Sequence, residues 1–331
     1  MDRIVLGHGS GGKLMHELIR EQFGPAFGIA GFGDSAILDV NLQKLAFTTD
    51  SYVVSPLFFP GGDIGELAVY GTVNDLSVSG ARPLYLTAGF IIEEGFPFEH
   101  LKAIVVSMSK AAEKAKIKIV AGDTKVVNKG KGDGIFINTS GIGVLSDGIE
   151  FSAAKIRGGD TVLVSGQVGN HGVAVMSERN GISFDPPVVS DSAPLNSLIE
   201  RVCEVTKEVR FMRDPTRGGL ATTLKETAIE SGKCIRVKER TIPVAPQVKG
   251  ACDLLGLDPL YVANEGIVVA VVDPSAAEAV LEVMRQHPYG VNAHIIGSVE
   301  DSPKGMVLLE TRAGGTRIIE MLQGEQLPRI C

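Results

Sequence analysis

A glycine-rich stretch near the amino terminus has the residue types that hold phosphate groups. Residues 7–13 read Gly-His-Gly-Ser-Gly-Gly-Lys, which fits G-x-x-x-x-G-K, between an apolar strand pattern at 4–6 and a helical pattern. Backbone N–H groups and one lysine can surround phosphate oxygens. The next residue is Leu14, whereas a true P-loop has a serine or threonine there for Mg²⁺. The pattern favours phosphate binding with the metal held elsewhere, and a plain glycine turn remains the alternative.

Several acidic residues could hold that metal. Asp50 and Asp123 each follow an apolar strand pattern, and Asp75 follows Asn74 inside an apolar helix pattern, where an unpaired acid is costly. Asp34, between Gly33 and Ser35, is a fourth candidate. Mg²⁺ favours a few carboxylates together with phosphate oxygens and water. A turn or helix cap is the commoner role for any one aspartate, so the prediction rests on the set.

An arginine-containing loop could bind an anion in the second half of the chain. Residues 213–219 read Arg-Asp-Pro-Thr-Arg-Gly-Gly and lead into a helical pattern at 217–231. A glycine-rich helix start beside Arg217 suits an anionic group. Simple capping of the helix by Asp214 or Thr216 is the alternative.

A single glutamate near a strand edge is a candidate general base. Glu265 lies in the sequence Ala-Asn-Glu-Gly at 263–266, just before an apolar run. A carboxylate there could take up a proton during catalysis. Taken alone, an ordinary turn carboxylate is the simpler interpretation.

The four cysteines differ in their surroundings. Three lie among apolar or helical residues, and none forms a C-x-x-C pair, so neither a zinc site nor a redox dithiol is indicated; they are Cys203, Cys234 and Cys252. Cys331 is the last residue of the sequence, after a stretch without clear periodicity. A frayed end is the default for such a segment. A terminal thiol on an extended segment could also carry a reacting group.

Alternating strand and helix patterns surround these residues and predict an α/β or α+β class. We expect strands at 45–50, 84–92, 117–121, 134–145, 161–165, 234–237, 266–272 and 294–299, and helices at 63–79, 97–116, 170–179, 194–207, 217–231 and 274–286. A polar, glycine-containing stretch at 152–160 suggests a boundary. The expected division is a domain at 1–155, a second at 156–319 and a mobile tail at 320–331.

Composition excludes several classes of protein. The chain has 331 residues, 44% hydrophobic residues and a formal net charge of −7, which is typical of a globular protein of about two domains. The negative charge argues against non-specific nucleic-acid binding. No signal peptide or apolar run long enough for a membrane span is evident, so we expect a cytoplasmic protein without membrane contact.

Taken together, these motifs resemble the ATP-binding superfamily of aminoimidazole ribonucleotide synthetase, selenophosphate synthetase and thiamine-monophosphate kinase. Within it the chain is most similar to the HypE family of [NiFe]-hydrogenase maturation factors, over essentially its whole length. The specific stretches, besides those above, are Thr-Thr-Asp-Ser-Tyr at 48–52, Pro-Leu-Phe-Phe-Pro-Gly-Gly at 56–62, Gly-Asp-Thr-Lys-Val-Val at 122–127 and the terminal Pro-Arg-Ile-Cys at 328–331.

The resemblance implies a two-domain PurM-like fold, a homodimer paired through its first domains, and the cofactors ATP and Mg²⁺. It implies a HypF-type carbamoyltransferase that loads Cys331, ATP-dependent dehydration of the carbamoyl group to a thiocyanate, and a HypC–HypD complex that accepts the cyanide. The residues it marks as catalytic are Cys331, Glu265 and Lys125. Those marked for cofactor binding are Gly9, Gly11, Gly12, Lys13, Asp50, Asn74, Asp123, Thr216 and Arg217, and those marked for metal are Asp50, Asp75, Asp123 and Asp34.

Two other functions fit the same residues. A kinase or synthetase acting on a free small molecule would use the same ATP site and would not need a terminal cysteine. A non-catalytic scaffold would leave Cys331 as a mere chain end. A prenylation signal is excluded, because its cysteine must be fourth from the end.

Overall fold

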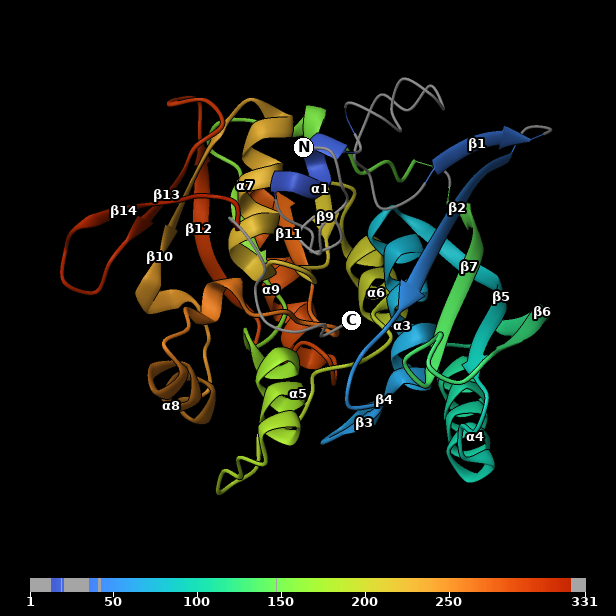
Figure 1. Ribbon diagram of the computed structural model, residues 1–331. Helices are drawn as coiled ribbons and strands as arrows, with labels where there is room; N and C mark the ends of the chain where they lie inside the picture. The colour runs from blue at the N-terminus through green and yellow to red at the C-terminus, as the bar shows by residue number, and fades with distance from the viewer. Residues whose placement is uncertain (1–12, 19, 21–35, 41–42, 147, 323–331) are drawn as a thin grey trace.

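The computed structural model describes residues 13–18, 20, 36–40, 43–146 and 148–322, which form two β-sheets and their helices (Figure 1). The mixed α/β class expected from the sequence is confirmed. Among the described residues, no helix is both long and apolar enough to cross a membrane.

The first sheet has five strands in the order β1-β2-β7-β5-β6, all antiparallel except the pair β5 and β6. The strands are β1 (Ala36–Val40), β2 (Gln43–Tyr52), β5 (Ala81–Glu93), β6 (Lys118–Val127) and β7 (Ile135–Leu145). Helices α3 (Ile64–Val78) and α4 (Phe98–Lys114) pack on one side, and Figure 1 shows no described helix on the other. We call this uncovered side the open face.

Helix α3 lies between the first sheet and α6 (Asn196–Val205) of the second half (Figure 1). Asp63 caps it by accepting hydrogen bonds from the backbone N–H groups of Gly65 at 2.7 Å and Glu66 at 3.0 Å. Almost every residue of α3 is buried, because both sides of the helix are covered. Any polar residue on α3 must therefore find a partner inside the protein.

The second sheet has seven strands in the order β14-β13-β10-β12-β8-β11-β9, and only β10 and β13 run parallel. The strands are β8 (Thr161–Val164), β9 (Val209–Arg213), β10 (Cys234–Lys238), β11 (Val269–Val272), β12 (His294–Glu300), β13 (Val307–Glu310) and β14 (Thr316–Ile319). A short hairpin, β3 (Phe58–Phe59) and β4 (Gly62–Asp63), stands apart.

Helices cover both faces of the second sheet. On β11, Val269 and Val271 share a core with α7, whereas Ala270 and Val272 share one with α6 and α9. The other helices of the described chain are α1 (Lys13–Leu18), α5 (Asn170–Asn180), α7 (Gly219–Ser231), α8 (Pro246–Leu255) and α9 (Ala277–Gln286), with 3-10 turns η3 (Ala153–Lys155), η4 (Glu239–Thr241), η5 (Pro259–Tyr261) and η6 (Pro274–Ala276). A strand buried on both faces reads as a continuous apolar run, which is why the sequence identified this region.

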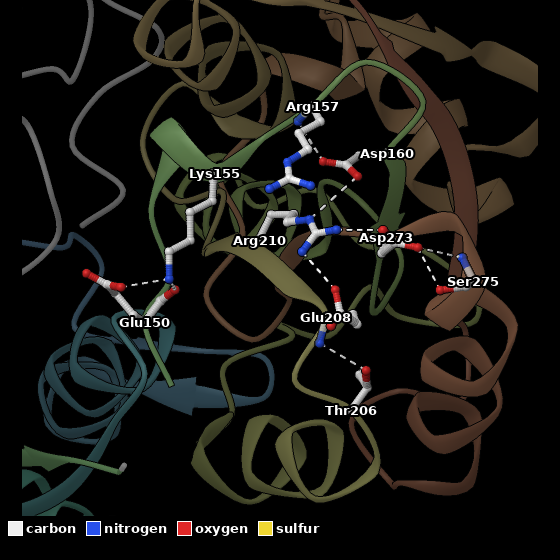
Figure 2. A network of polar contacts seen from close by, with 9 residues as sticks. All are labelled: Glu150, Lys155, Arg157, Asp160, Thr206, Glu208, Arg210, Asp273 and Ser275. Carbon is white, nitrogen blue, oxygen red and sulfur yellow. Dashed lines mark hydrogen bonds and ion pairs between the residues drawn. The ribbon is translucent and has the colours of Figure 1, made fainter. Parts of the chain in front are cut away.

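The chain passes from the first sheet to the second between Leu145 and Thr161, and residues 148–160 of this crossover are held by the ion-pair network in Figure 2. Arg210 on β9 contacts three carboxylates: Glu208 at 2.8 Å, Asp273 at 2.5 Å and the buried Asp160 at 3.7 Å. The backbone N–H of Arg157 also donates to Asp160 at 2.7 Å. The crossover is therefore fixed against β9 and η6.

Some expected elements differ from the observed ones. The strand expected at 117–121 continues to Val127, so Asp123 lies inside a strand and not after one; Asp50 likewise lies inside β2. The backbone N–H and C=O groups of β6 are hydrogen-bonded to β5, and those of β2 to β7, so both strands continue past these acids whatever side chains they carry. The helix expected at 217–231 begins at Gly219, and helix α8 and strands β1, β9, β13 and β14 were not predicted.

Candidate active site

The loop that carries Glu265 is held by its neighbour Asn264. The Asn264 amide donates to the carbonyl of Pro215 at 2.8 Å and accepts from the backbone N–H of Gly169 at 2.6 Å. Asn264 is fully buried, so these hydrogen bonds replace the water that its amide loses on folding. They fix the Glu265 loop against the 213–218 loop and the start of α5.

Asp191 holds the same loop from the other side, and the sequence analysis did not identify it. Its carboxylate accepts from the backbone N–H groups of His171 at 2.9 Å, Glu265 at 3.0 Å and Gly266 at 2.9 Å. Burial raises the pKa of Asp191 to about 6, although these donors act in the opposite direction. A Cβ on Gly266 would lie 1.7 Å from the Asp191 carbonyl oxygen, so only glycine fits there.

Glu265 itself is a buried carboxyl with other acids close by. Its side chain is almost inaccessible, and burial raises its pKa well above the ordinary value of 4.5. Asp214, Asp191 and Asp50 raise the pKa further, whereas Arg217 lowers it. Such a carboxyl takes up a proton readily, which is the property of a general base.

Arg217 joins the two halves of the molecule at this point. Its guanidinium lies 4.0 Å from the Asp50 carboxylate on β2. It follows the buried Asp214, so the 213–218 loop brings one carboxylate and one guanidinium close to Glu265. The structure thus brings together three predicted residues from distant parts of the sequence: Asp50, Arg217 and Glu265. Thr216, also predicted, belongs to the same loop, and its carbonyl accepts from the backbone N–H of Gly219 at 2.9 Å.

Asp75 and Asp50 belong to the same side of the first sheet. The Thr48 hydroxyl on β2 donates to the Asp75 carboxylate at 2.9 Å, so this acid on α3 is partnered, as its place in an apolar helix requires. Both acids raise the pKa of the buried Tyr52, although desolvation is the larger cause. Two of the predicted metal ligands therefore lie close to one tyrosine.

Asn74 ties α3 to the loop that carries Glu265. Its amide donates to the carbonyls of Ala193 at 3.0 Å and Glu265 at 3.3 Å, and accepts from the backbone N–H of Leu195 at 2.8 Å. The amide is fully buried, so these hydrogen bonds replace the water that it loses on folding. That Asn74 also binds the cofactor stays a prediction.

Asp123 does not join Asp50 within one chain. The register aligns Asp123 with Gly89, Asn138 and Ser51 on the open face. Asp50 is aligned with Thr139, whose hydroxyl donates to a carbonyl of α3 at 3.0 Å, so Asp50 is on the helix side. The described residues contain no group of three His, Cys, Asp or Glu that could hold a metal. Within one chain Asp123 therefore does not lie with Asp50 and Asp75, and the convergence of the three acids on one metal stays a prediction.

Lys125 lies beside Asp123 on the open face. Its ammonium donates to both carboxylate oxygens of Asp123, at 2.7 and 2.8 Å, and this pair lowers the pKa of Asp123. The Lys125 side chain is 68% exposed and the Asp123 side chain is 72% exposed. Within one chain, Lys125 is on the opposite side of the sheet from Glu265's neighbour Asp50.

The remaining predicted residues divide by whether the structure describes them. Lys13 is exposed at the start of α1, with its ammonium 3.7 Å from Glu17. Five lie outside the described residues: Gly9, Gly11, Gly12, Asp34 and Cys331.

Comparison with known proteins follows the same division into halves. Residues 32–145 match the AIR synthase related protein, N-terminal domain, and residues 157–310 match the AIR synthase related protein, C-terminal domain. Carbamoyl dehydratase HypE of Bradyrhizobium diazoefficiens is 54% identical over 99% of this chain and 96% of its own.

Two solved structures extend the comparison. A HypE–HypF complex contains a chain 52% identical to this one, with a TM-score of 0.87 over 92% of this chain and 99% of that one. A hydrogenase maturation protein HypE in complex with ATP is 48% identical, with a TM-score of 0.85 over 99% of this chain and 100% of that one.

Proposed function

The chain belongs to the HypE family of carbamoyl dehydratases, and on that premise we propose that it uses ATP to convert an S-carbamoyl group on its own Cys331 into a thiocyanate. The observation that carries the proposal is the buried Glu265 carboxyl, with its raised pKa, held beside Asp50 and Arg217. Dehydration of an amide requires removal of N–H protons, and a buried carboxyl of raised pKa is suited to accept them.

ATP supplies the activation that the reaction needs. The amide oxygen is a poor leaving group, and transfer of the γ-phosphoryl group to it makes a good one. Elimination then breaks the C–O bond, and the nitrogen loses its protons. The sum is carbamoyl-Cys331 plus ATP giving thiocyanate, ADP, phosphate and one proton. In this proposal Glu265 accepts a proton, and Arg217, whose guanidinium lies 4.0 Å from the Asp50 carboxylate, binds the phosphate.

The site suits a divalent cation. Glu265 has three acids near it, and Arg217 is the cation that lowers its pKa, so the local charge is negative. Asp50 and Asp75, on the α3 side of the sheet, are the residues that would hold Mg²⁺ with phosphate oxygens and water. When bound, it would neutralise charge on the transferring phosphoryl group.

The open face supports the homodimer. It exposes Phe47 and Tyr85 at 46% each and Ile91 at 47%, which are aligned on one side through β7. Pairing of two such faces removes this apolar surface from water. Asp123 and Lys125 share the face, so this pairing would bring them to the protomer interface, and we expect them to act on the site of the second protomer.

Two partners complete the proposal. The HypE–HypF structure supports a HypF-type carbamoyltransferase as the enzyme that loads Cys331. A HypC–HypD complex as cyanide acceptor follows from the family resemblance alone.

Mass spectrometry of the carboxyl-terminal peptide tests the proposal. After incubation with the carbamoyltransferase, carbamoyl phosphate and ATP, the peptide ending at Cys331 should gain a carbamoyl group and then lose one water. Cys331→Ala should form neither adduct while folding and binding ATP as the wild type does, because chain ends contribute little stability. An adduct on Cys203, Cys234 or Cys252 would instead favour a free-substrate kinase with adventitious labelling.

A further inference from the structure

Helix α7 anchors segments from both ends of the chain through two consecutive residues. Lys225 contacts the Glu320 carboxylate at 3.0 Å, close to the carboxyl-terminal end of the described chain. Glu226 contacts the imidazole of His16 on α1, which directly follows the glycine-rich stretch. The side chains of Lys225 and Glu226 are 10% and 11% exposed, so both are nearly buried, whereas the partner of Lys225, Glu320, is 56% exposed and His16 is 21% exposed.

Glu226 also connects α1 to the active-site loop. Its second oxygen lies 3.1 Å from the guanidinium of Arg213, the last residue of β9, whose side chain is 14% exposed. The next residue is Asp214, one of the acids that raise the pKa of Glu265. One carboxylate thus bridges the helix that begins with Lys13 and the loop that carries Asp214 and Arg217.

The first and last segments of the described chain also contact each other beside α7. The backbone N–H of Lys13 donates to the carbonyl of Leu322 at 3.5 Å. The Tyr261 hydroxyl donates to the Glu320 carbonyl at 2.8 Å, which fixes this segment a second time. Cys331 is the ninth residue after Leu322, so an extended chain could span about 30 Å between them. The tail therefore starts beside the lysine predicted to contact phosphate.

We infer that Glu226 is a positioning residue that sets α1, and with it Lys13, relative to the 213–217 loop, and that Lys225 sets the position of residues 320–322, from which the tail continues. The inference rests on the proposed function, since it assigns the two residues to different steps of it. Glu226 acts on ATP, through Lys13 at the start of α1. Lys225 acts on the approach of Cys331, through Glu320.

A purely structural role predicts a different result. If the two ion pairs only stabilise the fold, loss of either should lower the unfolding midpoint and reduce all kinetic parameters together. Positioning roles separate them, because ATP saturation compensates for a misplaced Lys13 and does not compensate for a misplaced start of the tail.

The test uses single turnover of the full-length protein already carbamoylated on Cys331, with ATP varied. The rate constant at saturating ATP is here called kcat, and the ATP concentration that gives half of it is called the apparent KM. Glu226→Gln should raise the apparent KM for ATP about tenfold and leave kcat within about twofold. Lys225→Met should leave this KM within about twofold and lower kcat about tenfold, and Lys225→Arg should restore it. The exposed pair Arg201–Glu204, 3.0 Å apart, gives the matched controls Arg201→Met and Glu204→Gln, which should change neither parameter.

A double variant sharpens the Glu226 arm. His16→Gln combined with Glu226→Gln should have the KM of the worse single variant, because the two residues act through one contact. Additive losses, unchanged kinetics, or a parallel fall of KM, kcat and unfolding midpoint would overturn the inference. Calorimetric titration of ATP into wild type and Glu226→Gln separates this inference from the proposed function. Wild-type protein that binds ATP but forms no thiocyanate contradicts the proposed function. Weaker ATP binding by the variant than by wild type still supports the role of Glu226.

Discussion

At the scale of single residues, Glu265 is a carboxyl whose burial costs folding free energy. Burial and the charges of Asp214, Asp191 and Asp50 favour its neutral form, and its raised pKa records that cost. The backbone around it is tightly held, by Asp191 on one side and Asn264 on the other. A carboxyl whose burial costs free energy, and whose backbone is nevertheless held in place by buried side chains, is typical of a functional group.

Glu265→Gln should abolish dehydration and stabilise the protein at neutral pH. The folded chain keeps the Glu265 proton to higher pH than the unfolded chain, whose carboxyl has the ordinary value of 4.5. Wild-type stability therefore falls as the pH rises from about 4.5 towards the raised pKa. The variant escapes this loss, by roughly 1.4 kcal/mol for each unit of pKa difference.

Urea unfolding between pH 4 and 8 measures the effect. The free energies of wild type and Glu265→Gln should be similar at the acid end and diverge in favour of the variant as the pH rises. Glu265→Asp, which keeps a carboxyl, should follow the wild type. A variant less stable than wild type at pH 8 would contradict this account.

At the scale of elements, the crossover between the sheets depends on Arg210. This side chain is 14% exposed and is the cation nearest to Asp160, which is 3% exposed. Figure 2 shows that Glu208 and Asp273 contact the same guanidinium. Burial raises the pKa of Asp160 and the guanidinium opposes that shift, so the pair matters more than a surface contact does.

Arg210→Met should destabilise the protein by about 3–5 kcal/mol, because it leaves Asp160 buried without its cation. Arg201→Met removes an exposed ion pair whose guanidinium and Glu204 carboxylate are 3.0 Å apart, and it should lower the free energy of unfolding by at most about 1 kcal/mol. Chemical denaturation at pH 7 compares them directly. Equal losses in the two variants would mean that the buried network contributes no more than a surface pair.

At the scale of the whole molecule, the open face decides whether the active site belongs to one chain or two. Asp50 and Asp123 are on opposite faces of the same sheet, so one chain does not present both carboxylates on one face of it. The exposed side chains Phe47, Tyr85 and Ile91 mark where a contact between two chains would form.

Tyr85→Glu together with Ile91→Glu should convert a homodimer into monomers and remove activity. Charges placed in the middle of an apolar contact are not compensated there. Sedimentation at micromolar concentration should show a species of about 35 kDa for the variant, the mass of one 34.9 kDa chain. A wild-type monomer would contradict the proposal.

Mixing inactive variants tests the sharing of residues between protomers. Asp50→Asn and Asp123→Asn should each be inactive alone. A mixed dimer carries one site with both substitutions and one with neither, so about a quarter of wild-type activity should return after random mixing. No recovery would place Asp123 in the same site as Asp50 of its own chain or outside both sites.

The sequence by itself determined the fold class, most of the elements and the family, because these depend on local periodicity and on contiguous motifs. Glu265, Arg217 and Asp50 were identified this way, and the structure brings them together. Only the tertiary structure decided that Asn74 joins α3 to the Glu265 loop, that Asp191 holds the same loop, and that Asp123 is on the opposite face of the sheet from Asp50. Strand order and the residues buried against each other are long-range properties, and a side chain's partner is fixed by packing between segments that are far apart in the sequence.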